Sequence, residues 1–385
     1  MHAYSRQLSR LCLICGLSFL FISCKNSNSQ NSTSISPSTA NSISGLRLIG
    51  DYNIAAQTQF NGVEFGGISG IDRDSEGHYW AISDDRGEVA NPRAYVLDIA
   101  LDANQISSIT INKMIYLHDE NNQLHPIGRK TIDPESIRMA QNGHVYISSE
   151  GNYSSNSTDL YQPFIREYSL DGSIIRQFDI PKAFYYQDNL MQGGRSNKLF
   201  EALTLTPKGQ LFAATEDALI QDGPMTSINN GSVIRFLKFD VNTGQNTAQY
   251  AYDIPKIPVD SPPETFRPDN GASEMLALSE NEFLVIERAY ADLVGNTIRI
   301  VKATIQPNTT DVRQISSLVN AQYQSISKQT LLELPIQYNS IKIENIEGIS
   351  WGPTLANGHR TLILVSDNNF QNQKNTQFLA FEVLP

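Results

Sequence analysis

The sequence has no cysteine after residue 24. All three cysteines of the 385-residue chain, Cys12, Cys15 and Cys24, lie at its beginning. A domain formed by the later residues therefore has no disulfide, no thiolate nucleophile and no cysteine ligand for a metal. Its stability has to come from a hydrophobic core, and about 340 residues are ample to build one.

Amphipathic helical patterns and clustered histidines are also missing. Apolar residues recur with period two or in short runs rich in aromatic and β-branched residues, which is typical of strands. Three of the six histidines, His78, His144 and His359, each follow a turn glycine, and His118 and His125 lack a helical i, i+4 partner. This distribution argues against a histidine-based phosphatase and against a histidine-rich dinuclear centre.

Positive charge is scarce. Residues 1–23 contain two arginines and no acid, so the remaining chain has 27 basic and 40 acidic residues, a net charge of −13. Nucleic acid is disfavoured as a partner because phosphate binding needs a basic surface. An acidic surface is compatible with cation binding, although most surface acids simply keep a protein soluble.

The N-terminal segment has the pattern of an export signal. Arg6 and Arg10 precede a short apolar stretch that ends in Leu-Phe-Ile-Ser-Cys, which resembles a bacterial lipobox with acylation at Cys24. The alternatives are a plain secretory signal and an uncleaved anchor. We expect a lipoprotein-type signal peptide over residues 1–23, a Ser/Asn-rich tether over 24–43 and a folded domain over 44–385. The protein would then be exported and lipid-anchored to a bacterial membrane.

A short phrase recurs five times along the predicted domain. The first residues of successive copies lie 69, 66, 73 and 73 positions apart, and the two ends of the domain supply about one more period. Each copy precedes a turn and an apolar run that ends on acid. The copies are Gly66-Gly67-Ile68-Ser69, Glu135-Ser136-Ile137-Arg138, Glu201-Ala202-Leu203-Thr204, Glu274-Met275-Leu276-Ala277 and Glu347-Gly348-Ile349-Ser350.

A strand repeat that nearly closes on itself predicts an all-β fold of radial architecture, a β-propeller. Each repeat supplies an inner strand, a turn, a second strand and an outer hairpin. Five copies favour five blades, and a sixth blade with a degraded phrase is the alternative. We expect the two terminal strands to pair within one blade, because this pairing closes the ring and removes free sheet edges.

Acidic residues occupy two phases of the repeat, and equivalent positions of a propeller lie at equal distance from its axis. We therefore expect these acids to converge, and clustered carboxylates suit a cation such as Ca²⁺. The alternative is that each acid caps backbone amides or pairs with an arginine in its own blade. The candidate metal ligands are Asp84, Asp85, Glu135, Glu150, Glu201, Glu216, Glu274, Glu287, Glu347 and Asp367.

Four arginines lie near these acids in the sequence. Guanidinium groups match the oxygens of phosphate, so a cation and arginines at one end of a channel would form a phosphate site. Arg–Glu bridges within the ring are the simpler reading of each arginine taken singly. The candidate phosphate-binding residues are Arg86, Arg138, Arg195 and Arg288.

Five pairs of motifs together resemble the phytase-like family, described as having esterase-like activity of phytase. They are GGISGID with AISDDRG, DPESIR with ISSEG, FEALTLT with ATE, SEMLAL with VIERA, and NIEGISWGP with LVSDNNF. The resemblance implies a β-propeller and a hydrolase acting on a small phosphate ester or related ester, with calcium as a possible cofactor and no organic cofactor. It identifies no catalytic residue in this chain.

Two functions from different classes follow. The first is an ester hydrolase that uses metal-activated water, carboxylate ligands and arginine stabilisation of the transferred group. The second is a non-catalytic propeller lipoprotein that binds a ligand or a protein at one face. Turnover that depends on a cation distinguishes the two.

Overall fold

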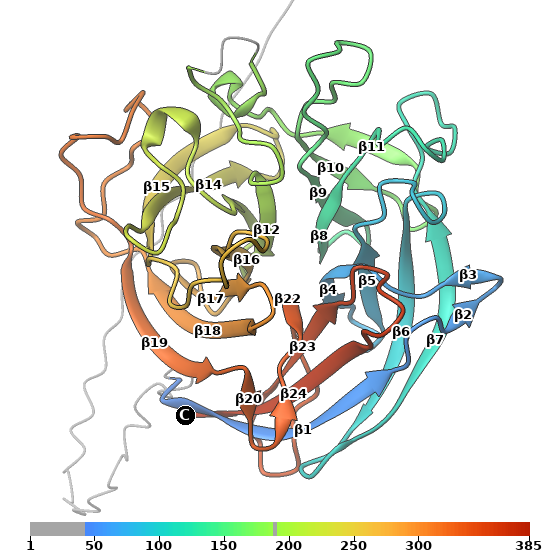
Figure 1. The fold of residues 1–385 in the computed structure, drawn as a ribbon. Helices are drawn as coiled ribbons and strands as arrows, with labels where there is room; N and C mark the ends of the chain where they lie inside the picture. The colour runs from blue at the N-terminus through green and yellow to red at the C-terminus, as the bar shows by residue number, and fades with distance from the viewer. Residues whose placement is uncertain (1–42, 188–190) are drawn as a thin grey trace, which may run out of the picture. The chain divides into compact units, whose positions relative to one another are not determined.

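The structure, a computed structural model, describes residues 43–187 and 191–385. The predicted signal peptide, Cys24 and all but the last residue of the predicted tether lie outside these ranges. The described residues form five four-stranded antiparallel sheets arranged around a common centre (Figure 1). This confirms the all-β propeller and settles the number of blades at five.

Each of the first four blades uses four consecutive strands. Blade 1 consists of β4 (Ile68–Arg73), β5 (Tyr79–Ser83), β6 (Arg93–Leu101) and β7 (Ile106–Tyr116). Blade 2 consists of β8 (Pro134–Met139), β9 (Val145–Ser149), β10 (Phe164–Tyr168) and β11 (Ile174–Gln177). Blade 3 consists of β12 (Phe200–Leu205), β13 (Gln210–Thr215), β14 (Ser232–Asp240) and β15 (Asn246–Ile254). Blade 4 consists of β16 (Asp269–Ala277), β17 (Glu282–Ala291), β18 (Gly295–Thr304) and β19 (Ser327–Leu334).

Blade 5 joins the two ends of the domain. It consists of β22 (Asn345–Trp351), β23 (Thr361–Asp367), β24 (Thr376–Leu384) and β1 (Gly45–Ile54), which pairs with β24 from Gly45↔Leu384 to Ile54↔Thr376. Two small hairpins, β2 (Gln59–Phe60) with β3 (Val63–Glu64) and β20 (Gln337–Tyr338) with β21 (Ile341–Lys342), lie outside the blades. The expected pairing of terminal strands is confirmed.

The hydrophobic core is divided among the blade interfaces. Five buried clusters each combine side chains of two neighbouring blades, as where Ile71 of β4 packs with Val365 of β23. Strands near the axis are covered on both faces, so β9 and β23 are buried at every residue. The outer strand β7 is exposed at alternating residues because one of its faces meets solvent.

The inner hairpins repeat the same turn. Gly77, Gly143, Gly209 and Gly358 all have positive φ, as the repeated glycine predicts. The histidine after three of these turns bonds an acid on the third strand of its own blade, for example His144 with Glu167 (2.7 Å). These histidines are therefore part of the blade framework.

Helical structure is limited to two short 3₁₀ turns, η1 (Lys182–Phe184) and η2 (Ile220–Asp222), among the residues that the structure describes. In the same residues, no helix has the length and apolar character needed to cross a membrane.

Candidate functional site

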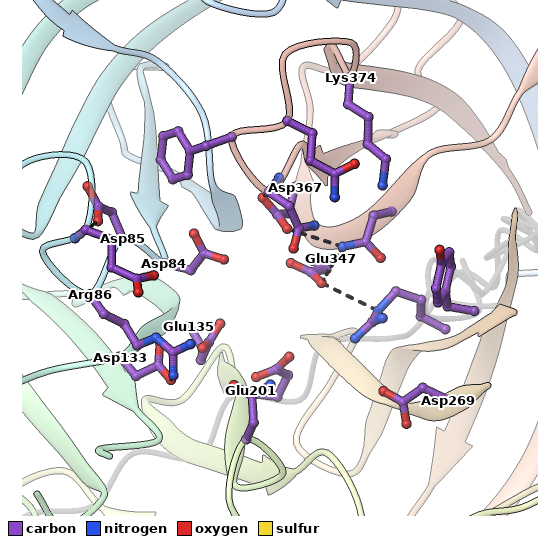
Figure 2. A pocket seen from close by; sticks show the side chains of 18 of the residues that line it. Asp84, Asp85, Arg86, Asp133, Glu135, Glu201, Asp269, Glu347, Asp367 and Lys374 are labelled. Atoms are coloured by element: carbon purple, nitrogen blue, oxygen red, sulfur yellow. Dashed lines mark hydrogen bonds and ion pairs between the residues drawn. The ribbon is translucent and has the colours of Figure 1, made fainter. Parts of the chain in front are cut away.

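An acidic pocket of about 480 Å³ opens where the inner strands begin and the second strands end (Figure 2). Figure 2 shows the carboxyl groups of Asp84, Glu135, Glu201 and Glu347 pointing toward one space. The other acids on its wall are Asp85, Glu88, Asp133, Asp269 and Asp367. Arg86, Lys198, Arg288 and Lys374 are its basic residues. Residues from all five blades thus meet here.

A β-bulge in the inner strand brings three of the glutamates to the pocket. In β12 the pairing with β13 skips Glu201, and in β22 the pairing with β23 skips Glu347. The pairing of β8 with β9 is interrupted in the same way beside Glu135. The extra residue of a bulge is left out of the ladder and its side chain is re-aimed. The repeated glutamate therefore faces the axis in three blades.

The same bulge in the other two blades holds serine. β4 skips Ser69 and β16 skips Ser273. In blade 1 the bulged residue therefore lies three positions after Gly66, the first residue of the phrase. In blade 4 it lies one position before Glu274. Glu274 follows the bulge and is not the structural counterpart of Glu201.

The end of the second strand supplies the next tier of charges. Asp84, Glu150, Glu216 and Asp367 occupy equivalent positions in four blades, directly after the residues paired beside each bulge. In blade 4 this position holds Arg288, because Ala272 pairs with Glu287. The tier thus contains four carboxylates and one guanidinium.

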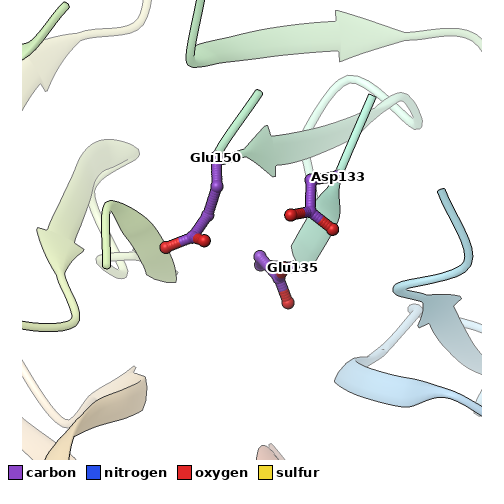
Figure 3. A group of neighbouring side chains, drawn as sticks. All are labelled: Asp133, Glu135 and Glu150. Atoms are coloured by element: carbon purple, nitrogen blue, oxygen red, sulfur yellow. The ribbon is translucent and has the colours of Figure 1, made fainter. Parts of the chain in front are cut away.

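Three acids lie close enough to share a metal ion. One oxygen from each of Asp133, Glu135 and Glu150 falls within 4.8 Å of the others (Figure 3). Glu150 is fully buried, and its Oε1 accepts a hydrogen bond from the backbone of Leu199, while Oε2 has no hydrogen-bond partner. An unpartnered buried carboxylate oxygen is costly without a cation. Three hard oxygen donors therefore fit a cation such as Ca²⁺ or Mg²⁺.

The pKa values of the pocket acids rise because the groups are buried and repel one another. Burial raises the pKa of Asp133 to about 7, although Arg86 opposes the shift. Burial raises the pKa of Glu347 to about 8 and that of Asp367 to about 6. For Glu135, burial and the charge of Glu201 hold the pKa well above its usual range. Such a cluster favours protons or bound cations over bare negative charge.

Basic side chains neutralise part of this charge. Arg288 contacts Glu216 (3.0 Å) and Glu347 (3.6 Å). Lys198 bridges Glu216 and Asp269 at 2.6 Å each. On the opposite wall, Arg86 contacts Asp133 (3.1 Å). The pocket therefore combines a carboxylate group able to hold a cation with ammonium and guanidinium groups able to bind an anion.

Some of the predicted site residues lie in or next to the pocket, and the others lie away from it. Eight line the pocket: Asp84, Asp85, Arg86, Glu135, Glu201, Arg288, Glu347 and Asp367. Glu150 and Glu216 lie next to residues of the pocket wall. Glu150 belongs to the acid triad with Asp133 and Glu135, and Glu216 forms an ion pair with Lys198. Asp85 has its oxygens occupied by Arg93 and by four backbone amides of residues 87–90. Those bonds outweigh burial and lower its pKa.

The structure places the remaining predicted residues away from the pocket. Glu274 forms an ion pair with Arg138 (2.9 Å), and Arg138 also donates to the carbonyls of Ile71, Leu203 and Met275. Through these contacts the pair joins the inner strands of blades 1 to 4. Arg195 donates to the carbonyls of Ala218 and Gly223. Glu287 is bound by Tyr252, Lys328 and Arg299.

Sequence reasoning missed several residues of the pocket. Asp133 and Asn345 each stand two positions before the bulged glutamate, so the repeat itself carried a signal for them. Asn345 donates to Glu347 (2.8 Å) and to Asp367 (3.3 Å). Lys198, Asp269 and Lys374 have no repeated counterpart in the phrase, and only the fold brings them to the site.

Comparison with solved structures finds matches of low similarity. The PQQ-bound aldose sugar dehydrogenase of Streptomyces coelicolor is 10% identical, with a TM-score of 0.35 over 86% of this chain and 97% of that one. A protein of unknown function from Dyadobacter fermentans is 8% identical, with a TM-score of 0.40 over 89% and 100%. A luciferin-regenerating enzyme is 10% identical, with a TM-score of 0.37 over 86% and 95%.

No curated protein matches the sequence significantly. A family model does match residues 63–370 of this chain. This range spans parts of all five blades and includes the pocket acids from Asp84 to Asp367. The match covers more than half of the chain, so the protein belongs to the phytase-like family, described as esterase-like activity of phytase.

Proposed function

We propose that the protein hydrolyses phosphate esters or related esters in the axial pocket, with a divalent cation held by Asp133, Glu135 and Glu150. The observation that carries this proposal is the triad itself: one oxygen from each residue lies within 4.8 Å of the others, and Glu150 has a buried oxygen without a hydrogen-bond partner. Family membership supports the ester substrate class.

The wall of the pocket opposite the triad suits an anionic substrate. Arg288 and Lys198 approach the same carboxylate, Glu216, and both also line the open space. Burial opposes the charge of Arg288, but Glu347 and Glu216 more than compensate and raise its pKa, so it stays cationic. Guanidinium and ammonium groups held in this way would orient a phosphoryl group and stabilise charge that develops on its oxygens.

The cation would supply Lewis-acid polarisation and a bound water of lowered pKa. The triad carboxylates must lose their protons to bind it. Arg86 favours this loss for Asp133 because its guanidinium lies 3.1 Å from the carboxylate. Glu201 lines the same space, and burial together with the charges of Glu216 and Glu150 holds its pKa well above its usual range. A protonated Glu201 is suited to give a proton to a leaving alkoxide.

The test measures calcium affinity and ester turnover together. The purified protein is assayed on phytate, simple phosphomonoesters and carboxylesters, with calcium and with a chelator. We expect turnover only with calcium. Glu135→Gln should weaken calcium binding by about tenfold or more, as loss of a charged group at a metal site commonly does, and should reduce turnover at limiting calcium.

Glu76→Gln is the matched control, because the Glu76 side chain is 81% exposed and lies outside the pocket. Turnover that persists in chelator would contradict the cation route. Calcium binding without hydrolysis of any ester would instead support the second candidate, a propeller that binds an anionic ligand, which the same pocket chemistry favours.

A further inference from the structure

An aromatic side chain is fixed at the pocket by a strained turn. After β23 the chain makes a turn in which Asn369 and Phe370 both have φ of 49°. This left-handed conformation is uncommon for residues other than glycine and is an outlier for a bulky side chain such as phenylalanine. Such strain persists only where the surroundings hold it, and it concentrates at functional sites.

Two side chains hold the turn in this conformation. Asp367 accepts a hydrogen bond from the backbone of Asn369 (2.6 Å). Asn368 Oδ1 accepts from the backbone amides of Phe370 (3.1 Å) and Gly67 (2.9 Å). The turn of blade 5 is thereby fastened to the start of blade 1. The conformation of Phe370 is determined by the fold and does not depend on a ligand.

The neighbouring residues leave room for the ring. A Cβ at Gly67 would lie 2.5 Å from the ring of Phe370, so only glycine fits beneath it. Arg93, which is fully buried, lies 5.7 Å from the ring centroid. Phe370 nevertheless remains partly exposed and lines the pocket. A rigid ring is thus presented to the same space as the acid triad.

A second aromatic ring lines this pocket from blade 4. Phe266 lies in the proline-rich connection between β15 and β16, and the residue is 71% exposed. Its backbone amide donates to Asp292 (3.2 Å). Both rings, Phe266 exposed and Phe370 partly exposed, keep apolar surface in contact with water on the wall of a strongly charged pocket. This contact with water is unfavourable, and a ligand that covers the rings would remove it.

We propose that Phe370 and Phe266 bind the organic portion of the substrate, so that the pocket takes esters whose alcohol portion presents an apolar ring. Inorganic polyphosphate and densely phosphorylated polyols have no apolar face for these rings. The inference deepens the hydrolase function proposed above and rests on it for the turnover measurement alone.

The experiment compares benzyl and butyl ligands, which are both attached through a CH2 group and differ in the ring. Calorimetry with benzylphosphonate and butylphosphonate in calcium measures binding without turnover, and hydrolysis of the two phosphate esters measures kcat/KM. We expect the wild-type protein to prefer the benzyl ligand by about tenfold, the scale of an apolar contact in a pocket.

Phe370→Asn removes the ring and keeps a residue that tolerates the left-handed backbone. Phe266→Ala is a second variant. Because Phe266 is exposed, we expect this substitution to leave the fold unchanged. Each should reduce the benzyl preference by threefold or more and leave the butyl ligand nearly unchanged. Ile175→Ala, at a surface position of β11 that is 45% exposed, should retain the preference.

The outcomes separate the two proposals. A benzyl preference in binding, with no hydrolysis of these two esters or of any ester assayed above, keeps the aromatic site and overturns the hydrolase. Hydrolysis of both esters without any preference, or a preference unchanged in both ring variants, overturns the aromatic site and keeps the hydrolase. Failure of both phosphonates to bind overturns the aromatic site.

Discussion

At the scale of single residues, the site depends on which residue of each repeat is bulged. The copies of the sequence phrase that begin with Glu135, Glu201 and Glu347 align with the structural repeat without a shift, and these three glutamates line the pocket. The phrase also predicts that Glu274 and Glu287 join these acids. In the structure, Ser273 holds the bulged position of blade 4 and Arg288 holds the position after its second strand. A shift of one residue reverses the direction of a side chain in a strand. Spacing alone could not reveal that shift, since connections between blades differ in length.

Gly67 gives a prediction at this scale. It has φ of +61°, and a Cβ there would overlap the carboxylate of Asp84 and the ring of Phe370. We expect Gly67→Ala to lower the free energy of unfolding by about 2–4 kcal/mol, of which about 1 kcal/mol is backbone strain and the rest overpacking. Chemical denaturation measures the change.

The matched control for this prediction is Gly62→Ala. Gly62 also has positive φ (+79°), but a Cβ there would meet no atom within 4 Å. This variant should lose only about 1 kcal/mol, the backbone contribution. Equal losses in the two variants would show that the contact of blade 5 with blade 1 is not tight.

At the scale of elements, strand positions were largely predictable. In the sequence, aromatic and β-branched residues recur in the runs 93–101, 232–240 and 377–384; the first two coincide with β6 and β14, and the third lies within β24. These strands can be recognised in the sequence because aromatic and β-branched residues are enriched in strands that pack against neighbouring sheets. The hairpins β2–β3 and β20–β21 were not predicted, since two-residue strands leave no periodic pattern.

The ion pair of Arg138 and Glu274 gives a prediction for how the inner strands are held together. Glu274 also accepts hydrogen bonds from Ser136 (2.5 Å) and from the backbone of Leu203 (2.9 Å). We expect Glu274→Ala to cost about 3–5 kcal/mol, because it leaves a buried guanidinium without its partner. Denaturant unfolding provides the value.

A double-mutant cycle tests the coupling. Arg138→Met combined with Glu274→Met should cost less than the sum of the two single changes, because neither charge is then left unpaired. Additive losses would mean that the two side chains stabilise their strands independently.

At the scale of the whole molecule, the acidic pocket makes stability depend on pH. Glu347, Asp133 and Asp367 have folded pKa values of about 8, 7 and 6, above the value of about 4 expected in an unfolded chain. Protons bound by the folded state stabilise it at low pH, and this contribution is lost as the pH rises through these folded values. We therefore expect Tm in chelator to fall by several degrees between pH 5 and pH 8.

Calcium should reverse this trend. Its ligands must be deprotonated, so the rise in Tm on adding calcium should be larger at pH 8 than at pH 5. Scanning calorimetry at both pH values, with calcium and with chelator, measures the effect. A calcium-induced rise in Tm of the same size at both pH values would mean that the pocket acids are not the ligands.

The pairing of β1 with β24 also has a consequence for how the domain is made. The first strand of the described domain finds its partner in the last, with Gly45 opposite Leu384. Contacts between such distant residues form late and slow folding. Until β24 is in place, β1 has no partner, so a partly folded domain carries an open strand edge prone to aggregation.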